Sequence, residues 1–591
     1  MRLISFAVNN FRGIAGGLDN NRINFLNSNT IFIFGQNNVG KSTFLNAYDF
    51  LFSNRKPVED DFYKKDDKLS IEFELEALID SVDLSCIEES LPKKIDSFKK
   101  YISKDNIIKI LRKFSESKEG ANKLEISKAQ DFTWDPVGDT WVETAFGSIG
   151  LTEVFQQLLP KPIIIKAMPT EEEAEQVVNN ILSSKAKERL DKEQLEKMKS
   201  AQDTVKELQE EMYNPASIAE YKRQVNQHFQ KLFTDTRIEF EDESKIKWTE
   251  DKFGKKFNIH FTRNKEDGTK DESIPTSYQT IGHGAVRSAI FSLLLMQDVA
   301  KEKNRIEDRK EYLVLFEEPE LFLHPRLMKE LRELIYLVSG KNYPYQVLCA
   351  SHSPQMIDIS KPDSSIIRMV KNTSGTKLYQ INQEDFQIAK GAKSKADLKQ
   401  DLYEVLRFNP YICESFYADE VILVEGPTEE ILLRAILQKE SNIKQIFIVN
   451  CGSITNIPFY QKIYSKFLIR YHVICDTDES IQKGIDGYGA PVFDKEIQGS
   501  IYEQFHKDSP NSRKCAGTMH VHCKNFESAH DSVDIPECWR FGKAGCKDSD
   551  GKPFNANQYW RKVLEIDYDK LGIEKVPIIN AAKKIIDFSW N

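Results

Sequence analysis

At 591 residues the chain exceeds the size at which one hydrophobic core keeps growing, so we expect two or three domains. Hydrophobic residues make up 40% and charged residues 29%, the ordinary balance of globular protein. A net charge of −9 argues against a protein that coats nucleic acid along its whole surface. It does not exclude a local basic groove. The sequence has no apolar run near the roughly 18 residues that span a bilayer and opens without the apolar stretch of a signal peptide. The nine cysteines are an odd number and do not suggest a disulfide framework. We therefore expect a cytoplasmic protein with no membrane partner.

The first fifty residues alternate in the manner of strands. Thr30 to Phe34 is almost wholly apolar, which predicts a strand buried on both faces of a sheet. Leu69 to Leu75 alternates apolar and polar residues and predicts a half-exposed strand.

A phosphate-binding loop follows the first buried strand. Gly35 to Ser42 fits the G-x-x-x-x-G-K-[ST] pattern, and a helical stretch, Thr43 to Phe52, comes next. Glycines let the backbone N–H groups curl around phosphates, the lysine neutralises the β and γ phosphates, and the serine hydroxyl completes a Mg²⁺ shell. The residues predicted to bind ATP here are Gly35, Asn38, Gly40, Lys41, Ser42 and Thr43.

Between Pro169 and Phe233 the composition shifts to Glu, Lys, Gln and Leu. Apolar residues from Leu195 to Met212 approximate a heptad seam, and Pro215 interrupts it. We expect either a helical arm or self-association surface, or a helical subdomain packed on its own core.

Strand character returns at Arg237–Phe240 and Phe257–Phe261. A helix is expected from about Ala285 to Ala300, and then a solvated charged stretch from Lys301 to Glu311. Tyr312 to Phe316 is again apolar and predicts a buried strand.

Two carboxylates follow that strand directly. Glu317 is expected beside the phosphate loop, where it can hold Mg²⁺, and Glu318 is placed to polarise the attacking water. Leu323-His324-Pro325 comes next, and Ser351-His352-Ser353-Pro354 follows a further apolar strand.

The order of these motifs resembles that of ABC-type ATPases of the SMC, RecF and OLD branch, and Asn10-Phe11-Arg12-Gly13 is similar to the opening of that branch. The resemblance implies that His352 contacts the γ-phosphate. Gly282-His283-Gly284, before a helix, resembles a degenerate signature loop of these ATPases, and helix N-termini suit phosphates. Gly282 and Gly284 would then complete the ATP site of a second subunit, which implies a homodimer or a higher homo-oligomer.

After a mixed, polar connecting region, strands and helices alternate again. Val421–Val424, Ile446–Val449 and Tyr471–Cys475 are apolar runs separated by helical patterns, which predicts a second parallel sheet.

Acidic residues follow two of these strands. Glu425 ends the first, Glu429 falls in the next helical turn, and Asp476 and Asp478 follow the third strand. Carboxyl ends of parallel strands share one rim of a sheet, so we expect these side chains to converge on a divalent cation. Oxygen-only ligands favour Mg²⁺, Mn²⁺ or Ca²⁺ over zinc.

This pair of acidic motifs resembles the Toprim signature, and Glu425-Gly426-Pro427-Thr428-Glu429 is similar to the version in OLD-family nucleases. The resemblance implies two-metal cleavage of DNA, a later acidic residue and a transition-state lysine. Glu527 and Lys552 are the candidates for the last two. The nearby residues Cys515, His520, His522, Cys523, Cys538 and Cys546 could form a zinc site, but without C-x-x-C spacing the favoured interpretation is buried thiols and a mobile loop.

The predicted fold class is α/β, an ABC-type ATPase domain with an inserted helical region and then a Rossmann-like Toprim domain. The expected limits are 1–168 and 234–370 for the ATPase, 169–233 for the insertion, 371–419 for the connecting region and 420–591 for the Toprim domain.

The expected function is an ATP-gated, metal-dependent DNA endonuclease. Family resemblance implies anti-phage defence, with a helicase, or a retron reverse transcriptase with its RNA, as candidate partners. The alternatives are a topoisomerase-like or primase-like enzyme and a non-catalytic SMC-like DNA-binding ATPase.

Overall fold

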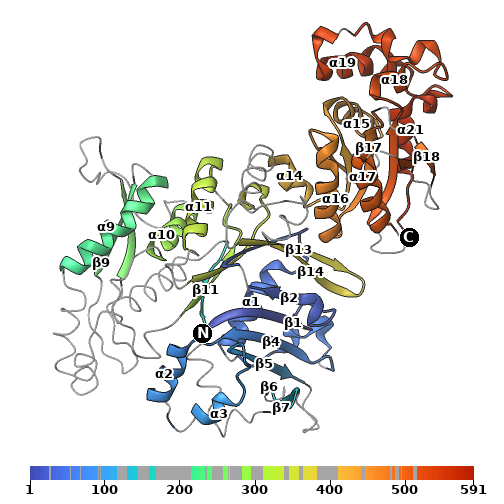
Figure 1. Cartoon of the computed structure of the whole chain (residues 1–591). Coiled ribbons are helices and arrows are strands. Elements are labelled where there is room, and N and C mark those ends of the chain that lie inside the picture. The colour runs from blue at the N-terminus through green and yellow to red at the C-terminus, as the bar shows by residue number, and fades with distance from the viewer. Residues whose placement is uncertain are drawn as a thin grey trace. The chain divides into compact units, whose positions relative to one another are not determined.

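A computed structural model of the chain divides into two compact units, Met1–Leu378 (the first unit) and Tyr379–Asn591 (the second unit) (Figure 1). No helix among the described residues is long and apolar enough to cross a membrane. The structure describes residues 1–25, 28–53, 55–66, 68–90, 92, 95–115, 129–143, 159–167, 215–232, 236–242, 257–263, 265, 283–294, 311–321, 323–338, 345–358, 364–382, 410–440, 446–478, 482–485, 491–493, 496–509, 515–546 and 548–590.

The first unit contains an antiparallel sheet with the strand order β2-β1-β4-β5-β6-β7. Side chains of β4 alternate between buried and half-buried positions, as the sequence pattern predicted. The glutamates on its solvated face pair with Lys or Arg residues of β5 and β2. Helices α2 (Ser81–Ser90) and α3 (Ile95–Lys99) follow β4. The strands are β1 (Arg2–Asn9), β2 (Arg22–Asn24), β4 (Ile71–Leu78), β5 (Ile107–Phe114), β6 (Gln130–Asp135) and β7 (Thr140–Glu143).

A second sheet of the first unit has the order β14-β13-β3-β12-β11-β8, and its strands from β13 to β8 pair in parallel. Every residue of β3 and of β12 is buried, which explains why both read as apolar runs. Helix α1 (Lys41–Phe52) follows β3, and α11 (Pro325–Val338) follows β11. The strands are β3 (Thr30–Phe34), β8 (Lys161–Ile165), β11 (Tyr312–Glu317), β12 (Tyr345–Ala350), β13 (Ser364–Asn372) and β14 (Gly375–Asn382). Strand β14 thus extends this sheet into the region expected to connect the domains.

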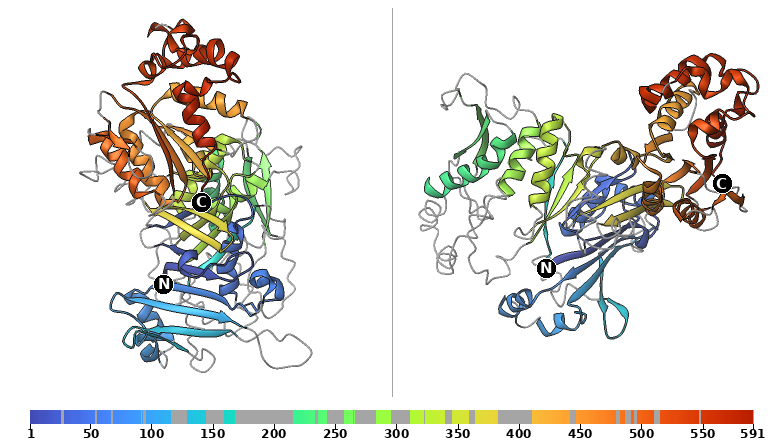
Figure 2. Two further views of the ribbon diagram at one scale, coloured as in Figure 1. Left: turned by 90° about the vertical axis from the view of Figure 1, so that its right-hand side faces the viewer. Right: turned by 45° about the horizontal axis from the view of Figure 1, so that its top comes forward.

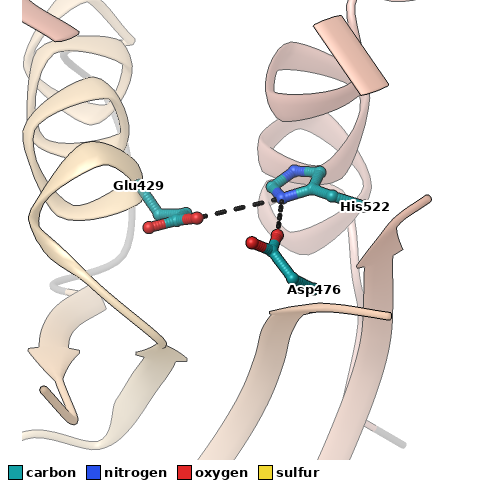
Figure 3. Close-up of side chains that lie close together, drawn as sticks. All are labelled: Glu429, Asp476 and His522. Carbon is teal, nitrogen blue, oxygen red and sulfur yellow. Dashed lines mark hydrogen bonds and ion pairs between the residues drawn. The ribbon is translucent and has the colours of Figure 1, made fainter. Parts of the chain in front are cut away.

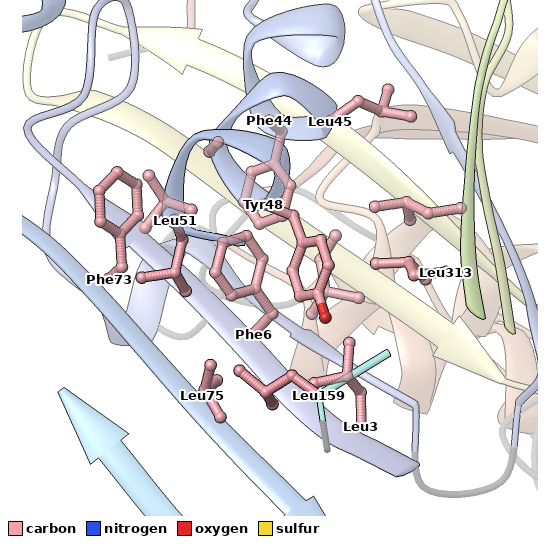
Figure 4. Close-up of a cluster of buried hydrophobic side chains, with 14 of the residues drawn as sticks. Leu3, Phe6, Phe44, Leu45, Tyr48, Leu51, Phe73, Leu75, Leu159 and Leu313 are labelled. Carbon is pink, nitrogen blue, oxygen red and sulfur yellow. The ribbon is translucent and has the colours of Figure 1, made fainter. Parts of the chain in front are cut away.

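One hydrophobic core joins the two sheets through α1 (Figure 4). The Phe6 ring of β1 lies 5.7 Å from the Phe44 ring and 5.4 Å from the Tyr48 ring of α1, centroid to centroid, both edge to face. Leu313 of β11 belongs to the same core. The Tyr48 hydroxyl donates to the Pro160 carbonyl at 2.7 Å, so this large side chain is buried without an unsatisfied polar atom. The phosphate loop at the start of α1 is therefore held by packing on both sides.

Helices and a hairpin of the first unit lie farther along the chain. Helix α9 (Pro215–Leu232) contacts β9 (Thr236–Asp242), which pairs with β10 (Phe257–Arg263) (Figure 2). Helix α10 (His283–Leu294) contacts α9 and α11. The predicted strands at β9 and β10 are confirmed. The heptad seam and the charged stretch expected before β11 lie outside the described residues, apart from residue 311.

The second unit is built on a parallel sheet with the strand order β16-β15-β17-β20. All five residues of β15 are buried, and α15, α19 and α21 share its core. The predicted second parallel sheet is confirmed, with β20 as a further strand beside β17. The elements are α14 (Pro410–Ser415), β15 (Glu420–Val424), α15 (Pro427–Lys439), β16 (Ile446–Asn450), α16 (Ile457–Lys466), β17 (Arg470–Asp476), β18 (Gln482–Ile485), β19 (Pro491–Phe493), α17 (Glu496–Lys507), β20 (Ala516–His522), α18 (Phe526–His530), α19 (Lys552–Tyr559), α20 (Glu565–Asp567) and α21 (Pro577–Ile586).

His530 is part of that core and is completely buried. Its Nδ1 donates to the Phe526 carbonyl at 2.8 Å, and its Nε2 accepts from the Ile578 backbone N–H at 3.1 Å. Both contacts require the neutral ring, because a second proton would remove the acceptor. Burial lowers the pKa of His530 well below its ordinary value, and the neighbouring His522 adds to this effect.

Replacing Phe6 by Ala should destabilise the first unit by about 3–5 kcal/mol, because the change removes a buried aromatic ring and leaves a cavity between the sheets. Urea unfolding of the full chain measures the loss. Val137→Ala, at a site that is 91% exposed, is the control and should stay within about 0.5 kcal/mol of wild type. Equal stability of the two variants would contradict the proposed role of this core.

Acid should destabilise the second unit through His530. Below about pH 6.5 the unfolded chain binds a proton at this residue and the folded chain does not, so stability falls as pH falls. One such proton contributes about 1.4 kcal/mol per pH unit, and His530→Gln should lose that part of the slope. Urea unfolding in EDTA at several pH values checks this. The exposed His506 offers the matched change, and His506→Gln should keep the wild-type slope.

Candidate functional site

The predicted phosphate loop joins β3 to α1 with a backbone that only glycine accepts at two positions. Gly35 has φ +151° and Gly40, which caps α1, has φ +110°. A Cβ on Gly35 would lie 2.3 Å from the Met369 carbonyl oxygen, and one on Gly40 would lie 3.1 Å from the Met369 methyl carbon. Asn38 also has a left-handed φ, +62°. This curled backbone at a helix N-terminus is the shape of an anion nest.

The Lys41 ammonium lies inside this loop. Its Nζ donates to the Gly35 carbonyl at 2.9 Å and to the Gln36 carbonyl at 2.8 Å. Burial lowers the pKa of Lys41 to about 8, while the charges of Glu318 and Glu320 act in the opposite direction. Ser42 and Thr43, also predicted to bind nucleotide, occupy the first turn of α1.

Glu317 ends β11 beside the start of α1. Asn46 of α1 connects the two, since its Nδ2 lies 2.8 Å from the Ser42 carbonyl oxygen and 3.4 Å from Glu317 Oε1. Burial raises the pKa of Glu317, which a bound cation would reverse. The donor set of Ser42 and Glu317 fits the Mg²⁺ site predicted here.

Glu318 and His352 face each other across the ends of β11 and β12. His352 Nε2 lies 3.5 Å from Glu318 Oε1, and Glu318 has a left-handed φ of +44°. Burial lowers the pKa of His352 and the nearby Lys41 charge adds to this, while Glu318 opposes it. Lys41, Glu318 and His352 are thus close enough to influence one another electrostatically, as the predicted ATP site requires.

Glu320 is a residue of this site whose role the sequence did not reveal. Its carboxylate accepts from the His352 backbone N–H at 2.5 Å and from the Ser351 hydroxyl at 3.0 Å. Burial raises the pKa of Glu320, and these hydrogen bonds oppose the rise. Glu320 thereby fixes the loop that carries His352. Of the predicted signature loop, Gly282 lies outside the described residues, and Gly284 lies in the first turn of α10.

Acidic side chains converge in the second unit where parallel strands end. Glu425 follows β15 and Asp476 ends β17, and Glu425 Oε2 lies 3.4 Å from the Asp476 backbone nitrogen. Burial raises the pKa of Glu425, the Asp476 and Asp478 charges add to the rise, and Lys552 opposes it. The structure therefore brings together the acids that the sequence separates by about fifty positions.

Glu429 lies in the first turn of α15 and is buried. Burial raises the pKa of Glu429 to about 7, and the Asp476 and Glu425 charges add to the rise while His522 opposes it. Asp478 has a φ of +45°, and its backbone N–H donates to the Lys524 carbonyl at 2.8 Å. The Thr477 hydroxyl accepts from the Lys524 N–H at 2.7 Å, so two hydrogen bonds fix the turn that carries Asp478.

Of the remaining predicted residues, Glu527 lies in the first turn of α18 and Lys552 begins α19. The Lys552 charge is among those that act on the pKa of Glu425. The roles of both residues stay predictions.

His522 joins the acids, although the sequence offered it only as part of a Cys and His cluster. Among the described residues, Glu429, Asp476 and His522 are the one group of three or more potential metal ligands whose ligand atoms lie within 4.8 Å of one another (Figure 3). None of the thiols from Cys515 to Cys546 belongs to it. Cys515 is buried as expected, but the expectation of buried thiols is wrong for Cys523 and Cys538, which are exposed. The mixed sequence of β20, Ala-Gly-Thr-Met-His-Val-His, gave no local signal for this role of His522.

The fold and both sites define a nucleotide-binding ATPase joined to a Toprim domain. A family model described as an AAA ATPase domain matches residues 1–357, and one described as the TOPRIM domain of overcoming-lysogenization-defect-like proteins matches residues 416–478. The chain belongs to the OLD family of ATPase–Toprim nucleases.

Two curated relatives match most of the chain. The Old nuclease of Escherichia phage P2 is 25% identical over 489 residues, which cover 81% of this chain and 77% of the relative. Endonuclease GajA of Bacillus cereus strain VD045 is 25% identical over 508 residues, covering 82% and 77%. Among solved structures, an SMC head bound to the winged-helix domain of ScpA is 13% identical to this chain, with a TM-score of 0.39. The match covers 66% of this chain and 100% of the SMC head.

Lys41→Ala should abolish nucleotide binding, because the loop loses the lysine predicted to neutralise the phosphates. Glu318→Gln should keep binding and lower hydrolysis about 100-fold or more, because the group placed to accept the proton of water is lost. Titration with a fluorescent ATP analogue and phosphate release measure the two effects. Lys56→Ala, at an exposed position after α1, is the matched lysine control. Wild-type hydrolysis by Glu318→Gln would contradict its proposed role.

Proposed function

We propose that this protein is a divalent-metal-dependent DNA endonuclease whose Toprim site is gated by an ATP-bound dimer of the ATPase domain, and that it acts in anti-phage defence. The observation that carries the proposal is the convergence of Glu425, Glu429 and Asp476 at one rim of a parallel sheet. Two relatives of similar length are named as nucleases, which supports the reaction class.

Electrostatics favour metal binding at this rim. Glu425 and Glu429 both have raised pKa values because burial and neighbouring carboxylates disfavour their charged forms. A divalent cation removes that penalty, and the carboxylate donors of Glu425, Glu429, Asp476 and Asp478 fit Mg²⁺, Mn²⁺ or Ca²⁺. When bound, such cations lower the pKa of water and stabilise the leaving oxygen of a phosphodiester.

The protein's own residues would orient the substrate around that centre. The Asp476 and Asp478 carboxylates extend from a turn held by the Lys524 backbone, which keeps their spacing constant. Lys552, close enough to alter the pKa of Glu425, is suited to neutralise charge that develops on the scissile phosphate. Glu527 is the candidate for a further acidic contact.

In the ATPase domain, Lys41 would neutralise the β and γ phosphates, and Glu318 would accept a proton from the attacking water. His352, facing Glu318, would contact the γ-phosphate. The signature loop at Gly282 and Gly284 would supply backbone N–H groups to the nucleotide of a second protomer, and this requirement couples nucleotide state to dimer formation. The role in defence, with a helicase or a retron reverse transcriptase and its RNA as partner, rests on the family resemblance.

Glu425→Gln and Asp476→Asn should each lower DNA cleavage about 100-fold or more, because they remove charge that holds the metals, and both should still bind ATP. Cleavage of supercoiled plasmid in Mg²⁺, Mn²⁺ or Ca²⁺, with and without ATP, measures the effect. Glu503→Gln changes an exposed glutamate of α17 and should cleave as wild type does.

Cleavage that persists in EDTA, or in both site variants, would overturn the proposal. A covalent protein–DNA adduct would point instead to topoisomerase-like chemistry. Binding of DNA without any cleavage would favour a non-catalytic DNA-binding ATPase.

A further inference from the structure

His522 ends β20, the strand that pairs with β17 in the second unit. His522 and Asp476 are register partners at the last position of their strands, so their side chains emerge at the same rim. His522 is 2% exposed. Figure 3 shows its ring directed at Glu429 and Asp476, which come from α15 and β17.

The distances suit one shared ion. His522 Nδ1 lies 3.2 Å from Asp476 Oδ1 and 3.9 Å from Glu429 Oε1. Metal–ligand bonds of about 2.0–2.2 Å place two ligands of one ion about 3–4 Å apart. The three ligand atoms, all within 4.8 Å of one another, can therefore bind a single cation after small side-chain movements.

The hydrogen bonding of His522 differs from that of two other buried histidines in the same unit. His530 uses both ring nitrogens, and so does His472, whose Nδ1 lies 2.7 Å from Thr518 Oγ1 and whose Nε2 lies 2.9 Å from Glu420 Oε1. His522 Nε2 has no hydrogen-bond partner among the described residues. All polar contacts of this buried ring are thus made by the nitrogen that faces two carboxylates.

Aromatic packing fixes the ring in that direction. The His522 ring lies 5.1 Å from the Phe526 ring and 5.1 Å from the His530 ring, centroid to centroid, both edge to face. A buried polar group with an unused nitrogen costs about 1–3 kcal/mol, so an ordinary core position would favour an apolar residue. A metal bond to Nδ1, which an apolar side chain could not make, is a reason for histidine at this position even though Nε2 has no partner among the described residues.

We propose that His522 Nδ1, Glu429 and Asp476 bind one divalent transition-metal ion, so that one metal position of the nuclease site has a nitrogen ligand. This inference rests on the proposed metal-dependent function and specifies the metal class. Two carboxylates and a neutral imidazole balance a doubly charged ion. Imidazole favours transition metals, whereas Mg²⁺ and Ca²⁺ prefer oxygen ligands, so this position selects ions such as Mn²⁺ or Zn²⁺ over Mg²⁺.

Pulsed electron paramagnetic resonance of Mn²⁺ tests the assignment on the full chain without nucleotide. One equivalent of Mn²⁺ should show ¹⁴N coupling from a directly bound imidazole in wild type and no such coupling in His522→Asn. The apparent Mn²⁺ affinity of His522→Asn should fall about tenfold or more, with a smaller loss of Mg²⁺ affinity. His506→Asn changes an exposed histidine of the same unit and should keep the ¹⁴N signal.

A second measurement does not depend on any variant. In wild-type crystals soaked in Mn²⁺, an anomalous peak should lie within bonding distance of His522 Nδ1. Tight Mn²⁺ binding without ¹⁴N coupling, with the peak on carboxylates alone, would overturn the role of His522 and leave the proposed function standing. Failure of wild type to bind Mn²⁺ at all would overturn both, and the plasmid assay would then show no metal dependence.

Discussion

Half-buried carboxylates lie where buried parallel strands end in both units. Glu317 follows the buried strand β11, and Glu425 follows the buried strand β15. Burial raises the pKa of each, because a charged carboxylate loses hydration that the protein only partly replaces. The sheets fix these positions through backbone hydrogen bonds, so the acids cannot move apart to relieve the penalty. Cations are the partners that suit such an arrangement.

The two units differ in the positive charges that lie near these carboxylates. In the first unit Lys41 provides a positive charge from within the chain, and its pKa of about 8 reflects burial opposed by Glu318 and Glu320. In the second unit Lys552 acts on Glu425, but Glu429 still has a pKa of about 7. The first site thus holds a buried lysine beside its acids, whereas in the second site burial and neighbouring carboxylates still raise the pKa of Glu429. This difference agrees with a phosphate ligand in one case and bare divalent cations in the other.

Much of this arrangement could be predicted because it follows from local patterns. A buried strand, a glycine loop and a helix identify Lys41, and apolar runs that end in acids identify Glu425 and Asp476. Glu320 and His522 could not be predicted in the same way. Their roles depend on which strands are neighbours: β11 lies beside β12, and β17 beside β20. Strand order is a property of the whole sheet, and a polar residue after a strand acquires its partners only when that order is known.

Backbone conformation adds information that no residue pattern contained. Glu318 and Asp478 both have left-handed φ angles, +44° and +45°, which are uncommon for residues with a Cβ. Each lies one or two residues beyond a strand whose last residue is acidic, and each turn is held by a backbone hydrogen bond to a neighbouring strand or loop. In each site a left-handed turn carries the second acid. Both sites therefore share a left-handed backbone conformation at an acidic residue just after a strand.

Packing holds the acids of the second site close together. Glu429 lies in the first turn of α15, where the helix dipole favours negative charge, but that stabilisation of about 0.3–1 kcal/mol is too small to restore an ordinary pKa. The acids and His522 stay together because the strands and helices that carry them share a core of buried aromatic and aliphatic residues. The spacing of these potential metal ligands thus follows from the packing and pairing of the strands and helices that carry them.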